Sequence, residues 1–300
     1  RSLLNLLSRV TVPARGSVGG SFTIEGGSKN ILIRAVGPSS TGVTGVLTDP
    51  RLALINASFL PAAANDDCGT PQTVAGGPAP GNASAISAAI ASVAAAPGFT
   101  AGSKDAALLV TLTAGTYTAV LDGVGGAGGV AQLEIVDADT GIWPRVAMLT
   151  MRGPVTGAKH LIVGFNLGGP VARDYLIRVM GPTFGYSPGV LVDPVISLFS
   201  GSTSGTEPLY YNDDWYGSSA VQAALASSGA PPFSVADDYN GYDSALLGTL
   251  APGTYTADIA PYSPDYQSGE VLFEIFNLDG ERPTGIAPAI TYLARDQAVV

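Results

Sequence analysis

The sequence predicts an all-β protein with two tandem β-sandwich domains of the jelly-roll or immunoglobulin-like kind, each carrying one short helix. Three observations support this fold class. Motifs of the first half recur in the same order about 140 residues later. Short segments alternate apolar and polar residues at period two. Clusters of glycine, proline and serine interrupt these segments every ~8–15 residues, a spacing typical of sandwiches.

The internal repeat is the clearest of the three observations. Residues 31–38 match residues 175–182, and Asp49-Pro50 matches Asp193-Pro194. The other matched segments are 65–68 with 212–215, 104–109 with 242–247, 115–119 with 253–257, and 133–135 with 273–275. The sequence therefore divides into a first repeat, 1–143, a second repeat, 144–288, and a terminal segment, 289–300.

Each repeat is expected to consist mainly of short strands. In the first repeat we expect strands over residues 3–11, 21–25, 30–36, 51–57, 106–112, 116–122 and 130–136. Helices are expected over 85–95 and 219–227, where apolar residues recur at helical spacing. Each helix should lay one apolar stripe on its sandwich.

The composition excludes several classes of function. The net charge is −10, and charged residues make up 13% of the chain, against about 25% in ordinary soluble domains. Without a cluster of basic residues the chain is not expected to bind nucleic acid or anionic membranes. The longest run of small apolar residues, 85–96, is too short to span a membrane. A neutral polar surface suits a protein that packs against copies of itself.

No catalytic centre is predicted, so the protein is not expected to be an enzyme. The single cysteine, Cys68, excludes an intrachain disulfide, and we interpret it as a small buried residue. The single histidine, His160, lies in an apolar run and is interpreted as structural. Residues 123–128 fit a dinucleotide-binding pattern, but a strand is expected to follow instead of a helix, so a hairpin loop is predicted.

Acidic residues near strand ends are the best chemical candidates. The candidate calcium ligands are Asp66, Asp67, Asp105, Asp213, Asp214 and Asp243. Carboxylates from two adjacent loops are the hard oxygen ligands that Ca²⁺ takes. The alternative is that these residues form local hydrogen bonds with the backbone of turns. Both interpretations stay open at this point.

Two further pairs of residues are candidates, one pair of arginines for buried ion pairs and one pair of asparagines for glycosylation. Arg34 and Arg178 lie inside apolar strands and need partners there, for which Asp49 and Asp193 are the matched candidates. Asn56 and Asn82 each begin an Asn-Ala-Ser sequon, a short pattern that predicts N-glycosylation only in an extracellular protein.

These repeated motifs resemble bacterial pre-peptidase C-terminal domains and, more closely, the tandem β-sandwich repeats of large secreted bacterial proteins. The resemblance covers both repeats and implies non-catalytic, extracellular accessory modules. Some members bind calcium through loop acids, which would correspond here to the six candidate ligands above. Cys68 departs from the pattern, in which the tryptophan at position 215 is the usual residue.

The terminal segment suggests how the protein acts. Residues 290–295 are similar to residues 148–152, which are expected to open the second sandwich. The chain begins with Arg and not with Met, which we interpret as a processed, secreted form. We expect residues 289–300, which reach about 40 Å when extended, to add a strand to a neighbouring copy. The expected interface residues are Ala289, Ile290, Tyr292, Leu293, Ala294 and Arg295, with Leu4 and Leu6 of the first strand.

The protein is therefore expected to be the subunit of an extracellular fibre or surface layer that polymerises head to tail. The alternative is a calcium-dependent, non-catalytic module of a secreted bacterial protein that binds glycan or protein through exposed aromatic residues. The aromatic candidates are Tyr210, Tyr211, Trp215, Tyr216, Tyr239 and Tyr242.

Overall fold

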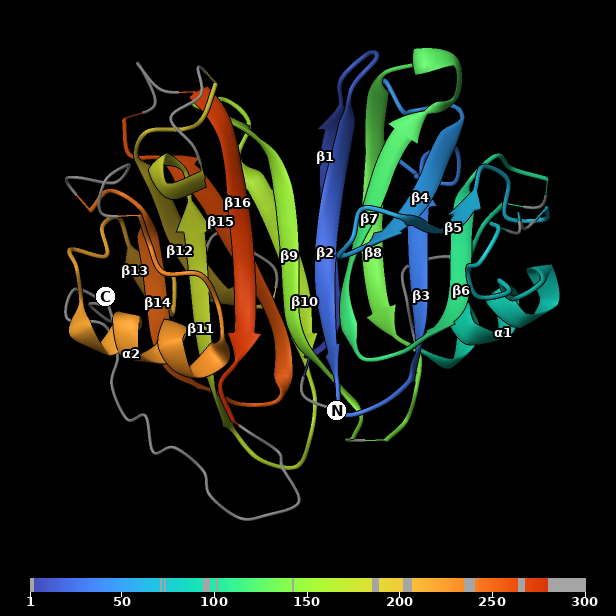
Figure 1. Ribbon diagram of the computed structural model, residues 1–300. Helices are drawn as coiled ribbons and strands as arrows, with labels where there is room; N and C mark the ends of the chain where they lie inside the picture. The colour runs from blue at the N-terminus through green and yellow to red at the C-terminus, as the bar shows by residue number, and fades with distance from the viewer. Residues whose placement is uncertain are drawn as a thin grey trace. The chain divides into compact units, whose positions relative to one another are not determined.

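The computed structural model describes residues 3–70, 72, 74–93, 98–100, 102–141, 143–184, 189–201, 207–234, 241–263 and 268–279. The contacts divide the chain into two units, Leu3–Leu149 and Thr150 onward (Figure 1). The division falls inside β9, a few residues after the expected boundary at 143. Each unit is described by itself below.

The first unit is a sandwich of two antiparallel sheets. Its elements are β1 (Leu3–Val12), β2 (Ser17–Glu25), β3 (Lys29–Val36), β4 (Pro50–Asn56), β5 (Pro61–Asn65), α1 (Ala83–Ser92), β6 (Ala106–Leu112), β7 (Gly115–Gly123) and β8 (Gly129–Asp137). One sheet has the order β1-β8-β3-β6, and the other has the order β2-β7-β4-β5. A short 3₁₀ turn, Val124–Gly126, joins β7 to β8, so the glycine-rich segment is the predicted hairpin loop.

The second unit repeats this arrangement strand by strand. Its elements are β9 (Arg145–Thr156), β10 (Leu161–Leu167), β11 (Arg173–Met180), β12 (Pro194–Ser200), β13 (Tyr210–Asn212), α2 (Ser219–Ser228), β14 (Ser244–Leu250), β15 (Gly253–Pro261) and β16 (Ser268–Asn277). Its sheets have the orders β9-β16-β11-β14 and β10-β15-β12-β13. A 3₁₀ turn, Pro182–Phe184, follows β11.

The fold class predicted from the sequence is confirmed in the described residues, where each sandwich carries one short helix. The extended segment expected at 289–300 lies outside the described residues. None of the helices in the described part of the chain combines the length and apolar character needed to cross a membrane.

The predicted alternation fills the core of each sandwich. In β2, Val18, Phe22 and Ile24 are at most 5% exposed, while most of the residues between them are half-buried. The ring of Phe22 stacks on Tyr117 with centroids 5.7 Å apart, and in the second unit Phe165 stacks on Tyr255 at the same distance. The duplication therefore preserves this cross-strand aromatic pair.

The helices begin and end at the residues that helix capping favours. The Oδ1 atom of Asn82 accepts a hydrogen bond from the Ala85 N–H at 2.9 Å, and Ser218 caps α2 through Val221 in the same way. Gly229 ends α2 in the left-handed conformation, with a φ of 72°. Both helices are shorter than the ~12–15 residues that an isolated helix needs in water, so packing on the sandwich stabilises them.

Two short strands, β5 and β13, were not expected from the sequence. Both lie at the end of their sheet. β5 begins at Pro61, which has no N–H to donate, and β13 has only three residues, 210–212. Short or proline-containing edge strands carry too few alternating residues to be recognised, and they limit pairing with other chains.

The Gly-Pro motif that follows β3 and β11 has a steric cause. A Cβ atom on Gly37 would lie 2.0 Å from the Leu47 carbonyl oxygen, and one on Gly181 would lie 1.8 Å from that of Leu191. No side chain fits at such distances, so glycine is required at this position of both units.

We expect Gly37→Ala to lower the free energy of unfolding by about 1–3 kcal/mol or more, because backbone must move to admit the methyl group. Urea denaturation followed by circular dichroism measures the change. Gly69→Ala is the control, since a Cβ atom there meets nothing within 4 Å. Equal stability of the two variants would contradict the steric argument.

Candidate functional site

A buried ion pair joins the two central strands of one sheet in the first unit. Arg34 of β3 lies directly opposite Glu134 of β8. Their side chains are 0% exposed, and Nη1 lies 2.9 Å from Oε2. The Nδ2 atom of Asn5 also donates to Glu134, at 3.4 Å. The guanidinium lies over the ring of Phe99, 4.8 Å from its centroid.

The second unit contains the same pair. Arg178 of β11 lies opposite Glu274 of β16 and donates to its carboxylate through Nε. Nη1 of Arg178 donates to the Pro231 carbonyl at 2.7 Å. The guanidinium lies over Phe233 and Phe276, at 5.2 and 5.5 Å from the ring centroids. Each arginine is therefore held by a cross-strand carboxylate and an aromatic ring.

The prediction that Asp49 and Asp193 are the partners of these arginines was wrong. Asp49 instead accepts a hydrogen bond from the Nζ of Lys104 at 2.6 Å, near the surface. Asp193 accepts one from the Tyr262 N–H through its backbone carbonyl. The sequence did carry the correct signal, because a Glu stands inside the apolar strand motif of both repeats.

Burial dominates the electrostatics of the two glutamates. It raises the pKa of Glu134 above its ordinary value, and the Arg34 charge and the hydrogen bonds to it oppose the shift. Burial raises the pKa of Glu274 in the same way, with Arg178 opposing. The pairs are therefore structural charges removed from water, and neither opens to a substrate.

Two of the predicted calcium ligands act as hydrogen-bond acceptors for the turn after β3 or β11. The buried carboxylate of Asp105 accepts from the Gly37 N–H at 2.7 Å, the Ser39 N–H at 3.2 Å and the Ser103 hydroxyl at 2.6 Å. Asp243 accepts from the N–H groups of Gly181 and Thr183, at 2.7 and 3.1 Å. The alternative interpretation, turn stabilisation, describes these two residues.

The Asn of the repeated Asn-Asp-Asp motif is the residue that ties neighbouring strands together. Asn65 donates to the Asp67 carbonyl at 2.9 Å and accepts from the Ala107 N–H at 3.0 Å. Asn212 does the same with Asp214 and Ala245, at 2.9 and 2.8 Å. The acids of this motif were predicted to have a role, whereas a role for the asparagine was not predicted from the sequence.

The remaining four candidate calcium ligands do not form one cluster in the described residues. Asp66 accepts a hydrogen bond from Gln72 at 2.8 Å. Asp67 and Asp214 are bonded to the motif asparagines through their carbonyls, and the Asp213 carbonyl accepts from the Ser244 hydroxyl. Within the ranges that the structure describes, no group of three acidic, histidine or cysteine residues could hold a metal ion. Calcium binding by these residues stays a prediction.

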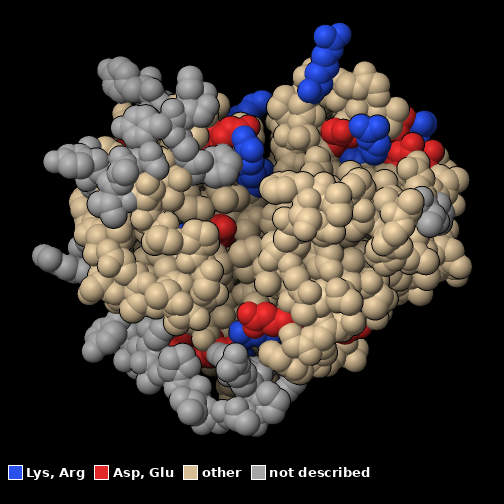
Figure 2. All heavy atoms as spheres, in the orientation of Figure 1, with Lys and Arg blue, Asp and Glu red and all other residues tan. Residues whose placement is uncertain are grey.

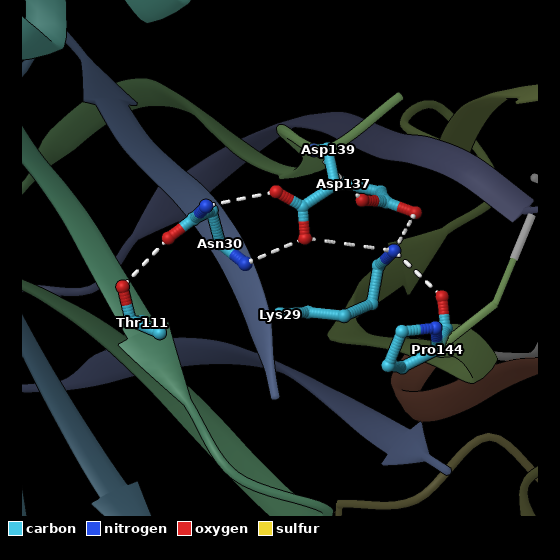
Figure 3. A network of polar contacts seen from close by, with 6 residues as sticks. All are labelled: Lys29, Asn30, Thr111, Asp137, Asp139 and Pro144. Atoms are coloured by element: carbon cyan, nitrogen blue, oxygen red, sulfur yellow. Dashed lines mark hydrogen bonds and ion pairs between the residues drawn. The ribbon is translucent and has the colours of Figure 1, made fainter. Parts of the chain in front are cut away.

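A second polar network fixes the chain where β8 ends (Figure 3). The buried Nζ of Lys29 lies 2.9 Å from Asp137 and donates to the Pro144 carbonyl at 2.8 Å. Asn30 donates to Asp139 through both its backbone N–H and its side-chain amide, and its Oδ1 accepts from Thr111. The segment that leads from β8 into β9 is thereby held against the start of β3.

The second unit keeps this network with its charges rearranged. Arg173 replaces Lys29 and lies 3.7 Å from Asp279. Asp174 replaces Asn30, donates to Asp279 through its N–H, and accepts from the hydroxyl of Thr249. Asn277 stands where the first unit has Asp137. The network is therefore a feature of the duplicated fold.

An open pocket of about 640 Å³ lies beside α1 in the first unit. Its walls are Asp67, Cys68, Gly69, Ala83, Ser87, Ile90, Gly98, Phe99, Thr100, Gly102, Ser103 and Lys104. Burial raises the pKa of the Cys68 thiol above its usual value. Cys68 is half-buried, so the expectation of a buried cysteine holds only in part.

Other predicted residues have local roles. Asn56 accepts hydrogen bonds from the N–H groups of Ser58 and Leu60 in the turn after β4, and Asn82 caps α1. His160 is more than a third exposed, with Nδ1 2.7 Å from Asp258.

Charged side chains occupy few places on the face of the molecule that Figure 2 shows.

The predicted interface residues divide into two groups. Leu6 of β1 is fully buried and Leu4 half-buried in a strand that pairs with β8 of its own unit. Residues 289–300 lie outside the described residues, as does Tyr239. Trp215 is only 5% exposed, so it was wrongly expected in an exposed aromatic patch, whereas Tyr216 is 63% exposed.

Comparisons with known proteins identify no family. No family model matches the chain, and no curated protein matches it. Among solved structures, the crystal structure of the mavirus major capsid protein aligns over 92% of this chain and 82% of that chain, at 10% identity and a TM-score of 0.18. A TM-score this low supports no conclusion, and the resemblance to pre-peptidase C-terminal domains stays a prediction.

We expect Glu134→Leu to lower the free energy of unfolding by about 3–5 kcal/mol, because it leaves the Arg34 charge buried without its carboxylate. The double variant Arg34→Met/Glu134→Leu should recover most of this loss. Asp122→Asn is the control, because it breaks the largely exposed pair with Arg51 and should cost under about 1 kcal/mol. Urea denaturation measures the loss of stability in each variant. If Glu134→Leu lost no more stability than Asp122→Asn, a structural role for the buried pair would be ruled out.

We expect Asp105→Asn to lower the free energy of unfolding by about 1–3 kcal/mol, because the amide group cannot accept from every donor around it. The loss should be the same in excess calcium and in excess chelator. If chelator abolished the difference between wild type and variant, Asp105 would act through a metal ion instead.

Proposed function

We propose that the protein is a non-catalytic structural subunit that assembles with copies of itself by adding residues 289–300 as a strand to a neighbouring sandwich. One observation carries the proposal. The segment that follows the last strand of the first unit becomes β9, and β9 lies beside β16 as the opening strand of the second sandwich. A segment in this position of the repeat therefore acts as a sheet-forming strand.

The terminal segment has the sequence pattern of such an opening strand. Residues 290–295 resemble 148–152 of β9, with apolar residues followed by an arginine. They also follow Asp279, which occupies the place of Asp139 at the exit from the first unit. By this pattern the next strand after β16 is again an opening strand.

The places that an opening strand takes in the two described sandwiches are already filled. β1 pairs with β8 at eight positions, from Asn5↔Val136 to Val12↔Gly129. β9 holds the same place beside β16. A second copy of the chain has the same two places filled, so we propose that the third opening strand extends one of that copy's sheets at an end strand, such as β6 or β14. Backbone hydrogen bonds would provide the affinity, as in other cases of strand addition.

The use of charge supports a structural role. The described residues place many of the basic side chains in ion pairs within one unit, such as Lys29–Asp137, Arg34–Glu134 and Arg178–Glu274. Charged residues make up only 13% of the chain, so most of the surface is neutral and polar, which suits a surface that packs against copies of itself. We place such an assembly in an extracellular fibre or surface layer.

We expect the full chain to form oligomers or filaments, and the chain 1–288 to remain a folded monomer. Light scattering after size exclusion and negative-stain microscopy measure the assembly, and circular dichroism measures the fold. A synthetic peptide of residues 289–300 should bind the truncated chain, and a scrambled peptide should not.

A pair of point variants tests the strand geometry. If alternate residues face the acceptor core, Ile290→Asp should weaken assembly far more than Thr291→Asp. Assembly that survives removal of 289–300, or a full chain that stays monomeric, would show the proposal to be wrong. Repeating each measurement with calcium and with chelator separates assembly from any metal requirement.

A further inference from the structure

Cys68 and Trp215 occupy the same position in the two units. The N–H of Cys68 donates to the Asp105 carbonyl at 2.9 Å, and the N–H of Trp215 donates to the Asp243 carbonyl at 2.8 Å. Both residues follow the Asn-Asp-Asp motif. The backbone is therefore equivalent at the two positions, and only the side chains differ.

In the second unit the indole of Trp215 fills the space beside the buried arginine. It stacks on Phe233 with centroids 4.6 Å apart and an interplanar angle of 24°. The same phenylalanine lies under the guanidinium of Arg178. Trp215 and Phe233 are 5% and 3% exposed, so the stack is closed to water.

In the first unit the phenylalanine of this stack is present, but Cys68 stands where the second unit has the indole, and no other ring contact with Phe99 occurs among the described residues. Phe99 lies under Arg34 as Phe233 lies under Arg178. Phe99 is only half-buried, and together with Cys68 it lines the 640 Å³ pocket. The pocket thus occupies the place that an indole takes in the second unit.

The helices show the same difference. The helix residues that are 0% exposed include Ile86 in α1 and Val221 in α2. One turn later, Leu225 of α2 is 1% exposed, whereas Ile90 of α1 is half-buried and lines the pocket. The face of α1 is therefore partly uncovered where Ile90 lines the pocket.

We propose that this pocket binds a small neutral molecule that contains a planar aromatic ring. The ring stacks on Phe99 and contacts Ile90, taking the place of the missing indole. The hydroxyl-bearing residues of the wall, Ser87, Thr100 and Ser103, offer hydrogen bonds to a polar substituent. The Lys104 charge is matched by Asp49 at 2.6 Å, so the pocket gives no preference for an anion. This binding site does not depend on the assembly proposed above.

The chain provides its own test, because Cys68 is its one cysteine. Indole is the probe, and the rate at which a disulfide reagent modifies the Cys68 thiol in the full chain is the readout. Indole should slow the reaction in a saturable way. Phenol should bind about 2–10-fold tighter than cyclohexanol, the fold-change expected from a stacking preference over equal apolar area. Equal binding of phenol and cyclohexanol, or no protection by indole, would overturn the proposal.

Two variants separate filling of the pocket from loss of the thiol. Cys68→Trp should restore the stack seen in the second unit, raise the urea midpoint and abolish indole binding in ligand-observed NMR. Cys68→Ala should leave the pocket open and keep indole binding. Indole binding to Cys68→Trp as tight as to the wild type would locate the ligand elsewhere and refute the assignment.

Discussion

The structure of each unit depends on one charge that has been removed from water. An arginine on the central strand β3 or β11 is held by a glutamate on the neighbouring strand, with both side chains almost fully buried. Leaving either charge without its partner is costly, so the two strands must stay in register. The loop that brings Phe99 or Phe233 over the guanidinium, and the helix before that loop, are organised around the same charge.

Much of the fold follows from the sequence, because sandwiches depend on local alternation and because duplication displays every motif twice. Alternation and helical spacing predicted the helices and the strands of the first repeat other than β5, and the tandem repeat predicted that residues 148–152 open the second sandwich. The partners of Arg34 and Arg178 could not be read from proximity in sequence, because Glu134 is brought to Arg34 only by strand pairing. Comparing the two repeats position by position finds both glutamates, and it also shows that Cys68 departs from Trp215.

The candidate sites were harder to predict than the fold. An aspartate near a strand end has the same sequence signature whether it binds calcium or a turn. Asp105 accepts backbone N–H groups because the Gly37 turn passes within hydrogen-bonding distance, a fact of tertiary structure. The pocket beside α1 forms where the small side chain of Cys68 replaces a tryptophan. A pattern of residue types within one repeat does not reveal such a space. It becomes visible only when the first unit is compared with the second.

The rearranged charges at the ends of β8 and β16 bear on how a tandem repeat folds. If β3 paired with β16 by mistake, the buried ammonium group of Lys29 would meet Asn277 in place of Asp137 and would lose that ion pair. Neighbouring repeats of similar sequence risk such exchange while they fold. The divergence of these few polar residues therefore disfavours pairing of β3 with the strand that belongs to the other half of the chain.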